Sequence, residues 1–233
     1  MCGRFVQEID PATLRDRFGV LNPPNVAWRP RYNLAPGQPA TILVAGRSGP
    51  EVEHAVWGLI PAWASPATAA HKLINARIET IWSKPAFRDA ARYRRCLVPA
   101  SGFYEWVPGS KGRAKIPYYF HRPTVPCLAL AGLWAVWNDR EGGECVSFAI
   151  ITRPADVTMR PYHARMPLIL HGHEEAVWLD QRRFRPTDLA EIAVARDVPL
   201  TGYPVAAKVN NVRVDEPACC QRVPLAVQAT WSL

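Results

Sequence analysis

The fold class follows from residues 96–133, which read CLVPASGFYEWVPGSKGRAKIPYYFHRPTVPCLALAGL. Aromatic and β-branched residues gather here in short apolar runs separated by Gly, Pro and Ser, which is typical of strands joined by turns. The stretch therefore predicts four strands in succession, at residues 96–99, 103–107, 117–121 and 127–133. Strands that cluster without alternating helices favour an α+β fold with an antiparallel-rich sheet over a doubly wound parallel sheet.

Further strands and a few helices are predicted on both sides of this stretch. The remaining strand candidates are residues 41–44, 53–59, 146–152 and 167–170. Asp10 and Pro11 are typical of a helix start and Gly19 of a helix end, so a short helix is expected between them. The other expected elements are an extended proline-rich segment at residues 23–39 and helices at residues 83–94, 173–179 and 187–195. No repeat or composition break divides the chain, so one domain is expected over residues 1–233.

The composition is that of a globular protein. Hydrophobic residues make up 48% and charged residues 21% of the 233 residues, which excludes a disordered tail and a coiled coil. The 23 prolines argue against a mostly helical chain, because proline breaks helix interiors. The longest apolar run, residues 127–137, is shorter than the roughly 20 residues that span a bilayer, and Glu8 and Asp10 interrupt any signal-peptide pattern. A cytoplasmic protein without a membrane partner is expected.

The charge suggests a partner, and the cysteines argue against a metal. The net charge is +8, and 23 of the 28 basic side chains are arginine. Arginine binds phosphate groups with paired hydrogen bonds, so nucleic acid is one candidate partner; a GC-rich genome, which raises arginine, alanine and proline together, is the other explanation. The six cysteines show no CxxC or Cys/His spacing, so metal and disulfide interpretations are weak and no cofactor is expected.

Cys2 carries distinctive chemistry if Met1 is removed. Its thiol and the new α-amine would then lie on one residue and form a 1,2-aminothiol. An α-amine with a pKa of about 7.7 to 8 is partly unprotonated near neutral pH and attacks aldehydes to form an imine. The neighbouring thiolate then closes a five-membered thiazolidine ring. The alternative is an incidental cysteine near a frayed end of the chain.

Ten sequence blocks, taken together, identify a family. In chain order they are MCGRF (1–5), RYNLAP (31–36), WGLIP (57–61), NARIET (75–80), PAFR (85–88), RCLVPA (95–100), GFYEW (102–106), AGLW (131–134), HARMP (163–167) and VN (209–210). Each block alone is weak evidence, but together they span nearly the whole chain in order. On these blocks the chain resembles the SOS-response-associated peptidase (SRAP) family.

The resemblance implies a fold and a function. The fold is a bent, barrel-like, antiparallel-rich mixed sheet with a few peripheral helices. The function is to sense abasic sites in single-stranded DNA, including single-strand/double-strand junctions, and to shield them as a covalent thiazolidine crosslink to Cys2. The family is also thought to remove its own initiator methionine, which gives it a self-processing peptidase activity. A monomer that associates with the nucleoid when bound to DNA is expected.

The resemblance also implies catalytic partners for Cys2. Glu105 lies among aromatic residues, where desolvation can raise the pKa of a carboxyl and suit it to proton transfer. Asn75 both donates and accepts hydrogen bonds, which suits it to fix the terminal amine or backbone. His163 can act as acid or base near neutral pH. Without the resemblance, a solvated strand glutamate, a turn asparagine and a structural histidine would be the ordinary interpretations.

The remaining candidates are DNA contacts. Arg4, Arg77 and Arg165 each follow a proposed catalytic residue by two positions, so on an extended strand both members of a pair would face the same way. Such arginines suit phosphate contacts, although surface arginines more often pair with carboxylates. Trp63 and Pro36 resemble the family's apolar residues that stack on bases beside the lesion, an interaction worth about 1 to 3 kcal/mol per base.

Three positions depart from the family pattern, and two other functions remain open. Ala64 replaces a second tryptophan found in at least one bacterial relative, Ala164 an acidic residue that would orient His163, and Ala206 a serine. One alternative is a cysteine peptidase acting in trans, with Cys2 as nucleophile and Glu105 or His163 as base. The other is a non-covalent single-stranded nucleic-acid binder that uses only a basic groove.

Overall fold

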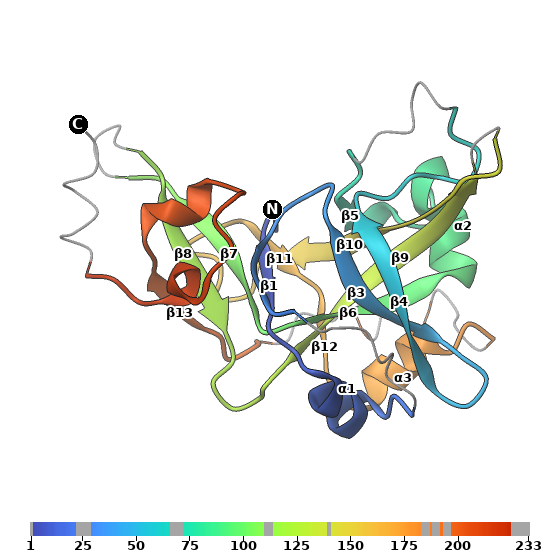
Figure 1. The fold of residues 1–233 in the computed structure, drawn as a ribbon, viewed down its shortest axis with the longest axis horizontal. Helices are drawn as coiled ribbons and strands as arrows, with labels where there is room; N and C mark the ends of the chain where they lie inside the picture. The colour runs from blue at the N-terminus through green and yellow to red at the C-terminus, as the bar shows by residue number, and fades with distance from the viewer. Residues whose placement is uncertain are drawn as a thin grey trace.

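Strands dominate the chain. The computed structural model describes residues 2–21, 29–65, 72–109, 114–138, 141–182 and 197–224, together with positions 187 and 192. Within these residues it contains thirteen strands and three α-helices. The strands form two sheets that lie side by side, and the helices lie on the outer side of the larger one (Figure 1).

The larger sheet closes into a five-stranded barrel. Its order is β10-β4-β3-β6-β9, and β9 pairs back with β10. Every pairing in this ring is antiparallel except β4 with β10, which is parallel. The bounds are Pro39–Ala45 for β3, Pro50–Trp57 for β4, Arg95–Ala100 for β6, Leu128–Asn138 for β9 and Glu144–Pro154 for β10.

Three short strands extend the barrel at its rim. Past the end of β4, β10 pairs in parallel with β5 (Asn75–Arg77) and in antiparallel with β11 (Arg165–Pro167). On the other side, β12 (Ile169–Leu170) pairs with β9. One edge of β10 therefore carries β4 and then β5, and the opposite edge carries β9 and then β11.

The smaller sheet has five antiparallel strands in the order β13-β8-β7-β1-β2. Its bounds are Phe5–Gln7 for β1, Arg31–Leu34 for β2, Gly102–Val107 for β7, Ile116–His121 for β8 and Thr201–Pro204 for β13. A single residue, Ser101, separates β6 of the barrel from β7. Gly102 is required after it, because a Cβ there would lie 2.5 Å from the Phe120 carbonyl oxygen. The two sheets are thus joined by one tight connection.

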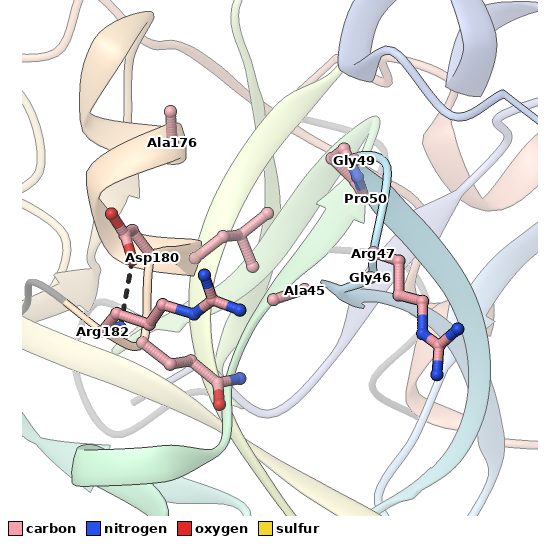
Figure 2. Close-up of a pocket in the computed structure, with 10 residues that line it drawn as sticks. Ala45, Gly46, Arg47, Gly49, Pro50, Ala176, Asp180 and Arg182 are labelled. Atoms are coloured by element: carbon pink, nitrogen blue, oxygen red, sulfur yellow. Dashed lines mark hydrogen bonds between the residues drawn. The ribbon is translucent and has the colours of Figure 1, made fainter.

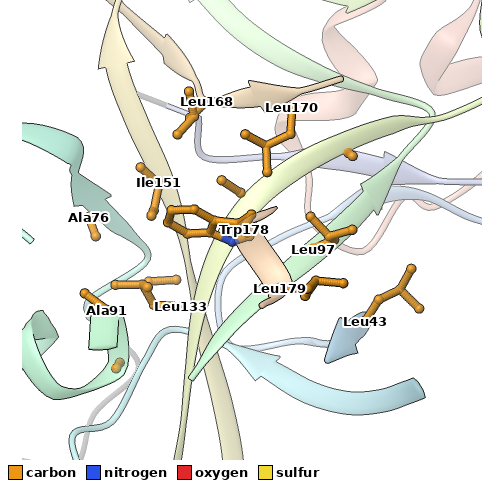
Figure 3. Packing of buried hydrophobic residues seen from close by; sticks show 14 of the residues in the cluster. Leu43, Ala76, Ala91, Leu97, Leu133, Ile151, Leu168, Leu170, Trp178 and Leu179 are labelled. Atoms are coloured by element: carbon orange, nitrogen blue, oxygen red, sulfur yellow. The ribbon is translucent and has the colours of Figure 1, made fainter. Parts of the chain in front are cut away.

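The barrel strands bury both of their faces. On one face, Leu97 packs with Trp178 and other apolar residues of the helices (Figure 3). On the other face, Phe148 belongs to a second cluster that also contains Phe103 of the smaller sheet and Cys2. The space between the two sheets is therefore an apolar core, and the start of the chain lies in it.

A buried arginine holds two of the three helices to the barrel. The helices are α1 (Pro11–Phe18), α2 (Pro85–Tyr93) and α3 (His173–Leu179), and the arginine binds the ends of α2 and α3. Arg95, fully buried on β6, donates from Nε to Trp178 O at 2.6 Å and from Nη2 to Asp180 O at 2.8 Å. Its Nη1 donates to the carbonyl oxygens of Ala91 and Arg92, both at 2.9 Å. One guanidinium thus satisfies carbonyl groups that the ends of α2 and α3 leave without helical partners.

The expected α+β class, barrel-like antiparallel-rich sheet and peripheral helices are confirmed. All eight predicted strands are present, and the residues predicted as 167–170 form parts of β11 and β12. Of the helices, α1 begins at Pro11 with Asp10 as its cap, α3 matches residues 173–179, and α2 begins at Pro85 rather than at Ser83. The helix expected at residues 187–195 falls outside the described residues, apart from two single positions.

Four short strands, β1, β2, β5 and β13, were not anticipated from the sequence as strands. Part of the proline-rich segment is extended as expected, since β2 and the start of β3 lie in it. Among the described residues, no helix is both long enough and apolar enough to cross a bilayer.

Arg95→Met is expected to lower the free energy of unfolding by about 3 kcal/mol, because several buried carbonyl groups lose a charged donor. Urea unfolding at pH 7 measures this change. Arg88→Met, at an exposed position on α2, is the matched control and should change stability by less than about 0.5 kcal/mol. Equal stability of the two variants would contradict the role assigned to Arg95.

Candidate functional site

Cys2 lies where the two sheets meet. It is fully buried and belongs to the apolar cluster that contains Phe5, Trp57 and Phe103. The start of the chain is seen between the sheets in Figure 1, above β1. Asn75 Nδ2 donates to the Cys2 carbonyl oxygen at 2.8 Å. A chain terminus is ordinarily mobile, so this bond fixes a residue that would otherwise fray.

Asn75 is placed by β5 at the rim of the barrel. It pairs with Ile150 of β10, and the preceding carbonyl, Ile74 O, accepts from Trp57 Nε1 at 2.9 Å. The side-chain oxygen, Asn75 Oδ1, is buried and has no hydrogen-bond partner among the described residues. Leaving a buried acceptor without a donor costs free energy. Asn75 Oδ1 therefore offers a hydrogen-bond acceptor to a donor at the start of the chain.

Glu105 and His163 form the second half of the site. Glu105 lies on β7, is 4% exposed, and pairs across the sheet with Tyr118. The ring of Tyr118 contacts that of Tyr162 at 5.2 Å, which brings the next residue, His163, toward Glu105. His163 Nδ1 lies 3.9 Å from Glu105 Oε1. Ring packing between β8 and the segment before β11 therefore places the imidazole near the carboxylate.

The orientation of His163 is fixed from within its own segment. Its Nδ1 accepts from the backbone N–H of Arg165 at 2.9 Å, and the carbonyl oxygen of Arg165 lies 2.8 Å from the same atom. The backbone therefore orients this ring, although Ala164 stands where the family has an acidic residue. The side chain is 30% exposed, so the ring is held by the backbone and still reaches solvent.

The thiol of Cys2 is held in its protonated form. Burial raises the pKa of the Cys2 thiol well above its usual range, and the negative charge of Glu105 raises it further. The nucleophilic form of cysteine is the thiolate. Burial and the Glu105 charge therefore both keep the reactive form of Cys2 scarce at neutral pH.

Arg4 is turned away from Cys2. Cys2 belongs to the cluster between the sheets, whereas the Arg4 guanidinium lies 5.7 Å from the ring of Trp106, which packs against a different cluster. Arg4 Nη1 donates to Asn33 Oδ1 at 2.6 Å and to a backbone carbonyl, Val209 O, at 2.8 Å. Its Nη2 donates to Asn210 O at 3.2 Å. Among the described residues, acceptors occupy three of its five N–H groups, and Nε–H and one Nη2–H have none.

Arg77 and Arg165 differ in how far the protein already uses them. Arg77 is exposed at the end of β5 and, like Asn75, belongs to that strand, so the expected same-face arrangement applies to this pair. Arg165 forms a paired salt bridge with Glu79 at 2.9 and 3.0 Å and also donates to the side chain and carbonyl of Thr152. Arg165 therefore has a carboxylate partner, which is the more common arrangement for a surface arginine than a phosphate contact.

Pro36 and Trp63 are exposed on two turns at one end of the barrel. Pro39 of β3 pairs with Val56 of β4, so the turn before β3 and the loop after β4 leave the sheet at the same end. The first turn is tied to β4 by Gly37 N–H, which donates to Trp57 O at 2.7 Å. Trp63 is 65% exposed, which is unusual for a side chain of its size.

Asn33 is a site residue that sequence reasoning missed. It is fully buried, and its Nδ2 lies 3.1, 3.1 and 2.8 Å from the carbonyl oxygens of Val209, Asn211 and Val214. We call residues 207–215 the C-terminal strap. Because Asn33 also accepts from Arg4, it joins the strap to the start of the chain. Its signal in the sequence was its place in the RYNLAP block, which by itself assigns no role.

A cavity of about 720 Å³ lies outside this site. It is formed by the turn between β3 and β4 and by residues at the end of α3. Figure 2 shows the side chains that line it and the hydrogen bond from Arg182 N to Asp180 Oδ1. None of the proposed catalytic or DNA-binding residues belongs to its lining.

Comparisons with known proteins give relatives over nearly the full length. The chain is 33% identical to the abasic site processing protein YoqW of Bacillus subtilis over 219 residues, which cover 93% of this chain and 97% of that protein. It is 32% identical to the abasic site processing protein HMCES of Xenopus tropicalis over 271 residues, covering 97% and 79%. A crystal structure of a protein from Bacteroides thetaiotaomicron superposes with a TM-score of 0.84 at 27% identity, covering 96% of this chain and all of that one.

The family model agrees with the ten blocks read from the sequence. The model described as SOS response associated peptidase (SRAP) matches residues 1–212, a range that includes Cys2, Asn75, Glu105 and His163. The chain therefore belongs to the SRAP family.

Proposed function

We propose that this protein recognises abasic sites in single-stranded DNA and captures them as a covalent thiazolidine adduct of Cys2. The observation that carries the proposal is the fixed position of Cys2 between Asn75 and the Glu105–His163 pair. The relatives named abasic site processing proteins support the substrate class. The adduct itself is the product, and it shields the strand.

The first step exposes the amine. Hydrolysis of the bond between Met1 and Cys2 releases methionine and leaves Cys2 with a free α-amine beside its thiol. We propose that the site performs this step on its own chain, which accounts for the peptidase name of the family. The α-amine of a chain terminus titrates near neutral pH, so an unprotonated fraction is available.

The free amine and the aldehyde of the abasic sugar then condense in three steps. The amine of Cys2 adds to the aldehyde carbon of the ring-opened sugar and forms a carbinolamine. Loss of one water gives the imine. The sulfur then adds to the imine carbon while the nitrogen regains a proton, and the five-membered ring closes. The net change is the loss of one water molecule.

Each polar group has a task in these steps. Glu105 takes the thiol proton and delivers a proton to the departing hydroxyl, which suits a carboxylate close enough to raise the pKa of the Cys2 thiol. Asn75 Oδ1, which has no partner among the described residues, accepts from the amine once it is free. His163 assists imine formation or its reversal.

The DNA contacts position the abasic sugar beside Cys2. The phosphates on either side of the lesion bind Arg4, Arg77 and Arg165, while Trp63 and Pro36 stack on neighbouring bases. Arg4 offers Nε–H and one Nη2–H, and Arg77 is exposed. Arg165 must exchange Glu79 for a phosphate, a modest change because Glu79 is 44% exposed.

The burial of Cys2 favours capture over peptidase activity in trans. A peptidase that acts on other proteins needs an accessible thiolate next to its base. Here the thiol is fully buried, its pKa is raised, and the imidazole contacts Glu105 and its own backbone. A single condensation that ends in a stable ring requires the buried thiol to be activated once, whereas a peptidase must activate it in every turnover.

The test is intact-mass analysis after mixing the protein with an abasic single-stranded oligonucleotide. The expected adduct has the mass of the protein that begins at Cys2 plus the oligonucleotide, less one water. A chain with one alanine inserted ahead of Cys2 should bind the oligonucleotide but form no heat-stable adduct, because its α-amine is no longer on the cysteine. Cys220→Ala is the matched control and should react normally.

The same mixtures separate the alternatives. Adduct formation at normal yield by the chain that retains the inserted alanine would rule out the thiazolidine. Turnover of a peptide library without any DNA adduct would favour a peptidase acting in trans. Binding unchanged in Cys2→Ala, with no denaturant-resistant species from the parent, would favour a non-covalent binder.

Asn75→Ala is expected to slow adduct formation by about tenfold or more, because the terminus loses the bond that fixes it. Binding of an oligonucleotide with an unreactive tetrahydrofuran abasic analogue should change less than about twofold. Gel-resolved rates and anisotropy titrations measure the two quantities. Asn138→Ala, at an exposed position on β9, is the control. An equal loss of rate and affinity would assign Asn75 a structural role instead.

Glu105→Gln is expected to make the Cys2 thiol more acidic. Removing the carboxylate charge lowers the pKa of the thiol, so its modification at pH 8 should speed up about threefold or more. Peptide mapping after partial modification of the Met1-containing chain measures the rate at each cysteine. The internal control is Cys96, whose thiol pKa is also raised, but by burial alone. Parallel changes at both cysteines would indicate loosening of the fold.

A further inference from the structure

Trp63 stands on a turn whose backbone is anchored although its side chain is exposed. Ala64 N–H donates to Pro61 O at 2.9 Å and closes the turn. The side chain between these two residues is 65% exposed. Exposure alone would allow the ring many orientations, so the backbone anchors decide how well it is placed.

The anchors of this turn come from the hairpin of β9 and β10. Trp137 of β9 donates from Nε1 to Ala64 O at 2.8 Å, just after Trp63. Ser147 of β10 is fully buried, and its Oγ accepts from Ile60 N–H at 2.9 Å, just before the turn. The turn is therefore held at both ends by one pair of barrel strands.

Anchoring of this kind changes binding without any contact to the ligand. A flexible loop must be ordered when it binds, and that cost subtracts from the stacking energy. A turn that is already fixed avoids most of this cost. Ala64 has a methyl group at the position next to Trp63, so one ring alone is presented by this pair of residues, and its placement matters more.

We propose that Trp137 is a positioning residue, which holds the Trp63 turn so that the Trp63 ring is presented for stacking on a base next to the lesion. The proposal rests on the proposed function, in which Trp63 contacts DNA. Trp137 acts through the Ala64 carbonyl and does not itself touch the nucleic acid. Ser147 fixes the base of the same turn from inside the core.

A double-mutant cycle tests the proposal on the full chain. Trp137→Phe removes the N–H donor and keeps most of the apolar ring, and Trp63→Ala removes the stacking group. The probe is a single-stranded oligonucleotide with one tetrahydrofuran abasic analogue, which cannot react, so affinity is measured apart from capture. Trp63→Ala should weaken binding about tenfold, and Trp137→Phe about three- to tenfold.

The decisive quantity is the effect of Trp137→Phe when Trp63 is already alanine. The proposal expects that this effect vanishes, because the anchor then has no ring to place. An equal loss of affinity in both backgrounds, or no loss in either, overturns it. Failure of the proposed function is seen separately, as the absence of any adduct between the parent protein and a reactive abasic oligonucleotide.

Trp178→Phe is the matched control. It removes the same kind of bond, from Nε1 to Cys96 O at 2.9 Å, in the core beneath the helices. It should lower stability and leave DNA affinity unchanged. Hydrogen exchange of the parent protein gives a measurement that needs no variant: the Ile60 amide and the Trp137 indole N–H should both exchange slowly. Fast exchange of both groups in the folded protein would also overturn the proposal.

Discussion

The bond from Asn75 Nδ2 to the Cys2 carbonyl is the contact on which the site depends. A chain end gains its position only from contacts of this kind, since its backbone is tethered on one side alone. Asn75 can supply the contact because β5 is carried by β10, a strand of the closed barrel. The first residues of the chain are thereby tied to the closed barrel through β5.

The same placement determines the chemistry of the thiol. Cys2 lies in the apolar layer between the sheets, where burial disfavours the thiolate, and the nearby carboxylate disfavours it further. A thiol of this kind is inert toward incidental electrophiles. In the proposed mechanism Glu105 accepts its proton, so the carboxylate that disfavours the thiolate is also the group that generates it. By that mechanism the site favours an electrophile that the protein has already bound.

The sequence predicted the regular parts of the fold well, since these depend on local patterns. The strands of the barrel have strong apolar runs, and α1 has both of its end signals in Asp10 and Gly19. The strands that were missed, such as β5 with three residues, are too short to carry a pattern of their own. They form because a longer strand offers an open edge, which is a property of the assembled sheet.

For the site, the sequence supplied the candidate residues but not their contacts. The two-residue spacing of Cys2 and Arg4 indicated a common face, yet the strand begins only at Phe5 and the Arg4 guanidinium lies over Trp106, outside the cluster that contains Cys2. The salt bridge of Arg165 with Glu79 joins residues 86 positions apart. Such pairings depend on how β11 lies beside the segment after β5, and no local pattern encodes that.

The three arginines are therefore not equivalent in their capacity to bind phosphate. Arg77 is exposed, Arg4 keeps two N–H groups beyond those that hold the C-terminal strap, and Arg165 is matched to a carboxylate. A phosphate at Arg4 adds to existing bonds, whereas at Arg165 it must replace one. The Glu79 side chain is 44% exposed and that of Arg165 is 15% exposed, so Glu79 is the partner that can return to solvent when a phosphate takes its place. In the proposed function, Arg165 thus stays paired with Glu79 until DNA is bound, while Arg4 and Arg77 make the first contacts.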